Sequence, residues 1–259
     1  SVLAGILRQP DDLTVPAPGI VQGPGWLGLK DAQLYLPYHE ALTTAGYSIL
    51  IFDYRGFGES EGDRGVLLPQ LQLDDLINAV TYMTTRDDVD TDNLGVFGSG
   101  GTGGGNAVLL AAVDKRIRVA VSQVPVADGE DWLHRMRREY EWQEFLARLE
   151  ADRRNRVVSG SGEMVHPREE IMVPTPERRA TKIKADVDDK IPSSVPLRCA
   201  EAIMHYRPID VVDQIAPSGL MVIGVENDAT TPTDHAIALY EKAGAPKKLV
   251  MQGHTTHYA

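Results

Sequence analysis

The chain has 259 residues, 42% of them hydrophobic, which is enough for one large α/β core with or without a covering segment. Its net charge of −11, from 26 basic and 37 acidic residues, argues against nucleic acid or an anionic membrane surface as the main partner. No run is long enough to span a membrane, no signal peptide is visible, and the single cysteine, Cys199, rules out an internal disulfide, so we expect a cytoplasmic protein.

Strand-like and helix-like segments alternate through the first half of the chain. The predicted strands are residues 2–9, 18–23, 47–53 and 93–98, and the predicted helices are residues 31–46, 69–85 and 105–113. The run YSILIFD at 47–53 is apolar throughout, which is typical of a strand buried on both faces. Gly46 is a suitable stop for the helix before it.

The second half contains one long segment that breaks this alternation. Further strands are predicted at 118–125, 220–228 and 247–253, with a helix at 233–244. Between about 128 and 206 no convincing strand of the sheet is found. We therefore predict an α/β fold with a mostly parallel sheet and helices on both faces, formed by residues 1–127 and 207–259. Residues 128–206 are predicted to form a helical cap; a surface excursion without a substrate role is the alternative.

The stretch DNLGVFGSGGTGGGNAV at 92–108 leads an apolar strand into a glycine turn that opens a helix. A nucleophile elbow is such a turn, and crowding requires small residues on both sides of the nucleophile. Gly98 takes the first small position, so the nucleophile position is 100, which is a glycine. Nucleotide binding is the weaker interpretation, because the glycine run has no Gly-Lys-Ser/Thr ending and follows the fourth strand.

Two late segments contain candidates for an acid and a base. In GVENDATTP, Asp228 follows a predicted strand and is placed to orient a histidine, with Glu226 as the alternative. In QGHTTHY, His257 lies beyond the last strand and is the candidate general base, with His254 as its competitor. The order elbow, acid, base is the one that this mechanism uses on this type of fold.

Together these stretches resemble the α/β-hydrolases, near the serine esterases and the X-Pro dipeptidyl-peptidase-like and dienelactone-hydrolase-like groups. The resemblance rests on QGPGW, DYRGFGESEG, GVFGSGGTGGGNAV, GVENDATTP and GHTTHY, which span nearly the whole chain. It implies a Ser-Asp-His triad, an acyl-enzyme intermediate and no cofactor or metal. It also implies that Asp228 is the acid, that His257 is the base, and that the backbone N–H groups of Trp26 and Gly101 form the oxyanion hole.

The sequence departs from the pattern of those groups at one position. Their elbow reads G-x-S-x-[ST/G]-G-G, and its serine falls on Gly100. One explanation is an engineered serine-to-glycine change that leaves an inactive or impaired hydrolase. A second is a natural protein that lost its nucleophile or uses His257 to activate water. A third is that Ser99 attacks, although Phe97 would then occupy the first small position.

We therefore predict a serine hydrolase that cleaves an ester, thioester or amide, in a nucleophile-deficient form. Hydrolysis of a carbon–carbon bond in a β-diketone-like substrate and a non-catalytic binding role are the alternatives. The expected partner is a small acyl substrate, and a homodimer through the cap or a sheet edge is the favoured assembly. The predicted substrate-binding residues are Trp26, Trp132, Tyr140 and Tyr206.

Overall fold

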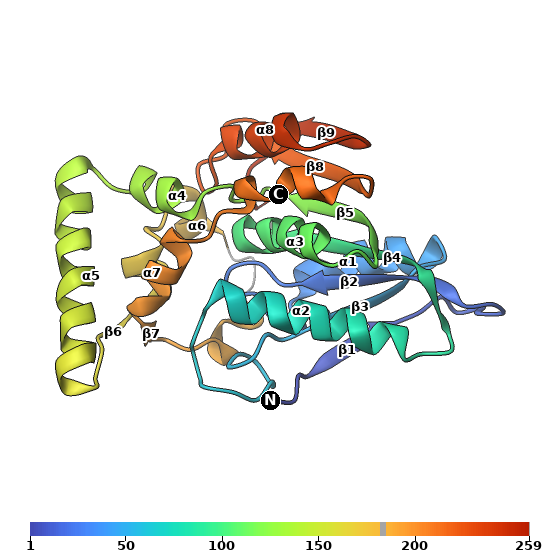
Figure 1. Cartoon of the computed structure of the whole chain (residues 1–259), viewed down its shortest axis with the longest axis horizontal. Coiled ribbons are helices and arrows are strands. Elements are labelled where there is room, and N and C mark those ends of the chain that lie inside the picture. The colour runs from blue at the N-terminus through green and yellow to red at the C-terminus, as the bar shows by residue number, and fades with distance from the viewer. Residues whose placement is uncertain (182–184, 259) are drawn as a thin grey trace.

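The computed structural model describes residues 1–181 and 185–258, and a seven-stranded sheet forms its centre (Figure 1). The strands are β1 (Gly5–Arg8), β2 (Ala17–Gly23), β3 (Ser48–Phe52), β4 (Val89–Ser99), β5 (Ile117–Gln123), β8 (Gly219–Val225) and β9 (Lys247–Gln252). Their order in the sheet is β1-β3-β2-β4-β5-β8-β9. Only the β1–β3 pair in this sheet is antiparallel, which confirms the predicted mostly parallel sheet.

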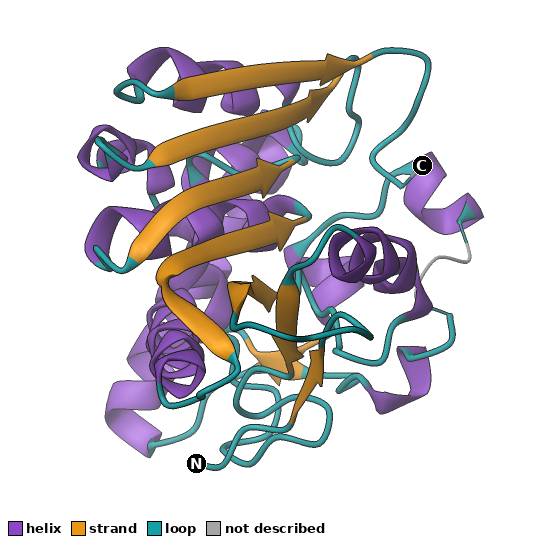
Figure 2. Cartoon of the chain, turned by 90° about the vertical axis from the view of Figure 1, so that its right-hand side faces the viewer, coloured by secondary structure: helices purple, strands orange, loops and turns teal. Residues whose placement is uncertain are grey.

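The central strands are buried because helices cover the sheet. All five residues of β3 are buried, as its continuous apolar run predicts. Helices α2 (Pro69–Thr84), α3 (Gly101–Val113) and α8 (Thr233–Lys242) lie against one face (Figures 1 and 2). Helix α1 (Leu36–Thr44) follows the short 3-10 helix η1 (Gln33–Tyr35) and covers part of the other face, where its Tyr38 ring lies 5.4 Å from the ring of Phe97 in β4.

The segment assigned to the cap lies beyond the carboxyl ends of the strands, on the side to which the arrows of Figure 2 point. It contains α4 (Gly129–Arg135), α5 (Glu139–Ser159), β6 (Met164–Val165), the π-helical turn η2 (Pro167–Ile171), α6 (Pro176–Ala180), η3 (Asp188–Lys190), β7 (Val195–Pro196) and α7 (Arg198–Met204). Strands β6 and β7 pair only with each other, in an antiparallel ladder of two residues each. The turns η4 (Pro208–Asp210) and η5 (Val212–Ile215) lead back to the sheet.

Local signals explain where several of these elements begin and end. The side chain of Asp128 accepts hydrogen bonds from the N–H groups of Glu130 and Asp131, which caps α4. Helix α5 ends at Gly160, whose φ of 75° is the left-handed conformation that glycine adopts without strain. Within residues 1–181 and 185–258, no helix has the length and apolar character that crossing a membrane requires.

Candidate active site

The turn between β4 and α3 has the form of a nucleophile elbow. β4 ends at Ser99, α3 begins at Gly101, and Gly100 lies between them with φ 81° and ψ 165°. This backbone conformation is essentially restricted to glycine, so the elbow is strained for any other residue. The carbonyl of Gly100 accepts from the N–H of Gly104 at 2.7 Å, and the carbonyl of Gly101 accepts from the N–H of Val126 at 2.8 Å.

Strand β4, helix α3 and the loop that contains Gly25 pack closely at the elbow, and the glycines there leave little space for added atoms. A Cβ atom on Gly98 would lie 1.9 Å from the carbonyl oxygen of Gly103, and one on Gly25 would lie 2.4 Å from that of Ser99. A Cβ atom on Gly100 would meet only the Cα of Gly25, at 3.5 Å. Gly100 thus has space for a Cβ atom, whereas Gly98 and Gly25 do not.

Asp228 and His257 form a hydrogen-bonded pair beyond β8 and β9. The Nδ1 of His257 lies 2.8 Å from Oδ2 of Asp228, and these side chains are 9% and 2% exposed. The other carboxylate oxygen of Asp228 accepts from the N–H groups of Thr230 and Thr231 at 2.7 and 2.8 Å. These contacts fix the carboxylate and leave Nε2 as the ring nitrogen available to a substrate or a water molecule.

The pair and the elbow border the same small cavity. The space that the centre of a water molecule can reach there is about 40 Å³, enough for a few water molecules at most. The residues that line it are Trp26, Gly100, Gly101, Trp132, Arg168, Met172, Arg178, Thr230, Thr231, His257 and Tyr258. The elbow, the predicted base and residues of the predicted cap segment thus meet around one space.

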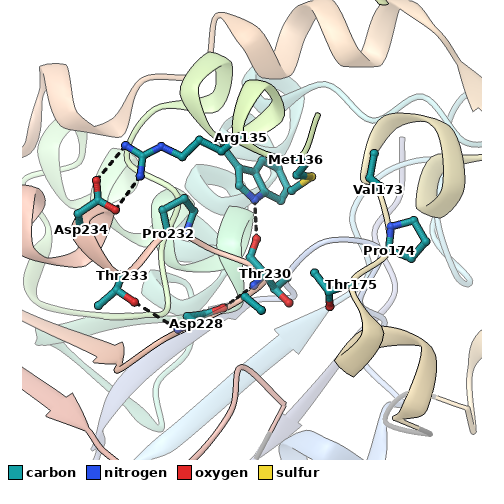
Figure 3. Close-up of a pocket in the computed structure, with 12 residues that line it drawn as sticks. Arg135, Met136, Val173, Pro174, Thr175, Asp228, Thr230, Pro232, Thr233 and Asp234 are labelled. Carbon is teal, nitrogen blue, oxygen red and sulfur yellow. Dashed lines mark hydrogen bonds and ion pairs between the residues drawn. The ribbon is translucent and has the colours of Figure 1, made fainter. Parts of the chain in front are cut away.

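A larger cavity of about 570 Å³ adjoins this one and shares Trp132 and Thr230 with it. Figure 3 shows it between the loop after β8 and the cap, with Asp228 on one side and Val173 and Pro174 on the other. The guanidinium of Arg135 makes two hydrogen bonds of 2.9 Å to the carboxylate of Asp234, so its charge is already paired (Figure 3).

Two of the four predicted substrate-binding residues line the small cavity. The rings of Trp26 and Trp132 meet edge to face with their centroids 5.9 Å apart. The Nε1 of Trp132 donates to the carbonyl of Thr230 at 2.8 Å, which fixes the ring beside the acid–base pair.

The other two predicted substrate-binding residues, Tyr140 and Tyr206, line neither of these two cavities. Tyr140 lies on α5 with 57% of its surface exposed. Tyr206 is buried under α3, where its hydroxyl lies 3.0 Å from the carbonyl of Thr102 and 2.9 Å from Oδ1 of Asn106. Burial raises the pKa of Tyr206 well above its ordinary value. Its contacts are those of a residue that supports the helix behind the elbow.

The phenylalanine variant tests this structural role of Tyr206. Tyr206→Phe should lower the free energy of unfolding by about 1–3 kcal/mol, because buried acceptors on α3 lose their donor. Tyr140→Phe, on the exposed helix, should change it by less than about 0.5 kcal/mol. Urea unfolding followed by circular dichroism measures both, and equal effects would contradict the assignment.

Three of the alternative site residues lie away from the cavity. Gly98 faces α3, so Ser99, the next residue of β4, points to the opposite face of the sheet, and it does not line the cavity. His254 and Glu226 are exposed, and neither lines the cavity. The structure therefore brings Gly100, Asp228 and His257 together and leaves Ser99 outside.

Sequence reasoning missed several residues of the cavity wall. Arg168 and Arg178 come from η2 and α6, short elements in a proline-rich segment without a periodic pattern. Thr231 follows the predicted acid by three residues, and its position in that loop was the only available signal. No group of three or more His, Cys, Asp or Glu side chains that could hold a metal ion occurs in the described part of the chain.

Comparison with known proteins gives this arrangement a family. The model of the family described as X-Pro dipeptidyl-peptidase (S15 family) matches residues 7–259. The chain belongs to this family. A relative from Escherichia coli, an uncharacterized 31.7 kDa protein in the traX-finO intergenic region, is 28% identical over 257 residues, which are 99% of this chain and 88% of the relative.

Solved structures show the same fold. The α/β-hydrolase GrgF from Penicillium sp. sh18 is 21% identical with a TM-score of 0.77, over 99% of this chain and 91% of GrgF. DcsB, solved in complex with its substrate analogue, is 17% identical to this chain with a TM-score of 0.81. The match covers 99% of this chain and 92% of DcsB. The chain thus has the α/β-hydrolase fold, and its relationships support an enzyme of the serine-hydrolase type.

Proposed function

We propose that this site hydrolyses an ester, thioester or amide of a small acyl compound, with Asp228 and His257 as the acid–base pair. The observation that carries the proposal is the 2.8 Å contact between Nδ1 of His257 and Asp228, beside a cavity that the elbow also lines. Such a pair activates a hydroxyl or a water molecule at the elbow. The cytoplasmic location remains part of the proposal and rests on the single cysteine.

With a serine at position 100, the reaction would follow the acyl-enzyme route. Nε2 of His257 would take the hydroxyl proton as the oxygen attacks the acyl carbon, and would return it to the leaving group. Asp228 would hold the imidazole tautomer and stabilise its protonated form. The N–H groups of Gly101 and Trp26 are the proposed donors to the developing oxyanion. Glycine offers no nucleophile, so this chain is proposed to be impaired in that route.

Direct attack by water is the second candidate, favoured by the open space at Gly100. Nε2 would take a proton from a water molecule in the cavity while its oxygen bonds to the acyl carbon. The same nitrogen would then protonate the leaving group as the acyl bond breaks. This route needs no side chain at position 100.

Covalent labelling tests where the nucleophile belongs. A fluorophosphonate probe should label the Gly100→Ser chain at position 100 and leave the native chain unlabelled, as read by peptide mass spectrometry. Ser99→Ala in the same background is the control and should keep the label, because Ser99 does not line the cavity. Labelling of the native chain at Ser99 would show that the elbow assignment is wrong by one residue.

A further inference from the structure

The wall of the small cavity contains positive charge contributed by the cap. Arg168 and Arg178 line it together with Gly100 and His257. Among the described residues that line this cavity, none is Asp or Glu. The carboxylate of Asp228 is already bound to His257. In a chain with 37 acidic and 26 basic residues, this local excess of cationic groups runs against the overall charge.

The two arginines differ in what neutralises them. Arg168 makes an ion pair with Asp188, and its side chain is mostly buried. The guanidinium of Arg178 has no ion pair or hydrogen bond with the residues that the structure describes, and its side chain is half-buried. Burial raises the pKa of the nearby Tyr258 phenol, while a hydrogen bond to Thr230 and the charge of Arg178 oppose that rise. Within the described part of the chain, Arg178 is therefore a cation without a paired carboxylate beside the acid–base pair.

A buried hydroxyl in the same wall also has no protein partner. Thr231 is 3% exposed, and its Oγ1 makes no hydrogen bond within the described residues. It lies beside the elbow, where a Cβ atom on Gly101 would be 3.3 Å from this oxygen. A buried hydroxyl is normally satisfied, so its lack of a partner indicates that a ligand or water molecule completes the site.

We propose that the acyl group of the substrate ends in a carboxylate, which Arg178 binds while the scissile carbonyl lies between His257 and the elbow, near the hydroxyl of Thr231. The inference rests on the proposed function and names its substrate class: a half-ester, half-thioester or half-amide of a short dicarboxylic acid. The small cavity limits the acyl chain to a few carbons, and the adjoining cavity of about 570 Å³ is the space for the leaving group.

The chemistry of the wall supports this choice over neutral or cationic acyl groups. Arginine binds carboxylates through parallel, charge-assisted hydrogen bonds, which strengthen where water is largely excluded. An acyl group with an ammonium would face Arg178 without a carboxylate in the wall to offset the repulsion. Arg178 comes from α6 in the cap, while Gly100 and Gly101 come from the elbow, so a linear acyl group would extend from the elbow toward the cap.

Binding to the native chain tests the proposal without turnover. Glutarate, its neutral dimethyl ester and inorganic phosphate are each titrated by calorimetry. Glutarate should bind, and Arg178→Gln should weaken it about tenfold or more, since a charge-assisted bond is lost. Arg179→Gln is the matched control: this neighbour on α6 is exposed, does not line the cavity, and its loss should change glutarate binding less than about twofold.

Three results would overturn the carboxylate site. The first is an equal loss of glutarate affinity in Arg178→Gln and Arg179→Gln. The second is tighter binding of the dimethyl ester than of glutarate, and the third is binding of phosphate without binding of glutarate. Arg178→Lys keeps the charge and should lose less affinity than Arg178→Gln, which guards against a variant that simply misfolds.

Turnover separates this inference from the proposed function. In the Gly100→Ser chain, mono-p-nitrophenyl glutarate should be hydrolysed with a lower KM than p-nitrophenyl butanoate, and Arg178→Gln should raise KM for the glutarate alone. If both esters are hydrolysed alike with and without Arg178, the function stands and the carboxylate site is wrong. If glutarate binds through Arg178 but neither ester is hydrolysed, the function is wrong and the binding site stands.

Discussion

A serine at position 100 should raise kcat/KM for a short p-nitrophenyl ester by about 10³-fold or more over the native chain. The gain is expected because His257 Nδ1 already lies 2.8 Å from Asp228, and a serine would supply the nucleophile that the proposed acyl-enzyme route requires. A Cβ atom on Gly100 would meet nothing closer than the Cα of Gly25 at 3.5 Å, so the surroundings leave space for the Cβ of a serine. Release of p-nitrophenol under steady-state conditions measures the effect.

The same substitution should also lower the stability of the fold, and this effect can be measured separately from the rate. The φ of 81° and ψ of 165° at Gly100 are unfavourable for serine, so Gly100→Ser should lower the free energy of unfolding by about 1–3 kcal/mol. A gain in rate together with this loss of stability would identify the strain as part of a working elbow.

Double variants show whether the gain depends on the proposed pair. Adding Asp228→Asn to Gly100→Ser should remove most of the gain, because the imidazole loses the carboxylate that sets its tautomer. Adding Ser99→Ala should leave the gain unchanged. A Gly100→Ser chain that is no faster than the native one would contradict the acyl-enzyme route. Activity of the native chain that vanishes with His257→Ala would instead favour direct attack by water.

Gly98→Ala should lower the free energy of unfolding by about 3 kcal/mol or more. The added Cβ would lie 1.9 Å from the carbonyl oxygen of Gly103 and 2.9 Å from the Cβ of Ala107. Both contacts are on α3, so relief requires the helix to move away from β4. Urea unfolding with a two-state fit measures the change.

A glycine elsewhere in the sheet provides the control. Gly219 begins β8, and a Cβ there would meet its nearest neighbour at 3.7 Å, an ordinary contact. Gly219→Ala should therefore change stability by less than about 1 kcal/mol. If Gly98→Ala is as mild as Gly219→Ala, the close packing of α3 on β4 does not explain why small residues occupy this elbow.

Most of the fold could be predicted because its strands and helices have strong local patterns. The continuous apolar run of β3 and the helical spacing of α2 each indicate an element without reference to the rest of the chain. The local pattern is weakest at the start of α3, which begins at Gly101, before the run GNAVLLAAV at 105–113 that indicates a helix by itself. The first five residues of α3 are all glycine or threonine, which have low helix propensity, and only packing against β4 and Gly25 makes them helical.

The candidate site likewise contains features that the sequence predicts and features that only the tertiary structure shows. The sequence by itself determined the order of elbow, acid and base, because carboxyl ends of parallel strands share one edge of the sheet and bring such residues together. Only the tertiary structure decided that Trp132 lines the cavity while Tyr206 supports α3, since burial and hydrogen-bond partners depend on segments far apart in the chain. The cationic wall at Arg178 also required the fold, because no local pattern places α6 opposite the elbow.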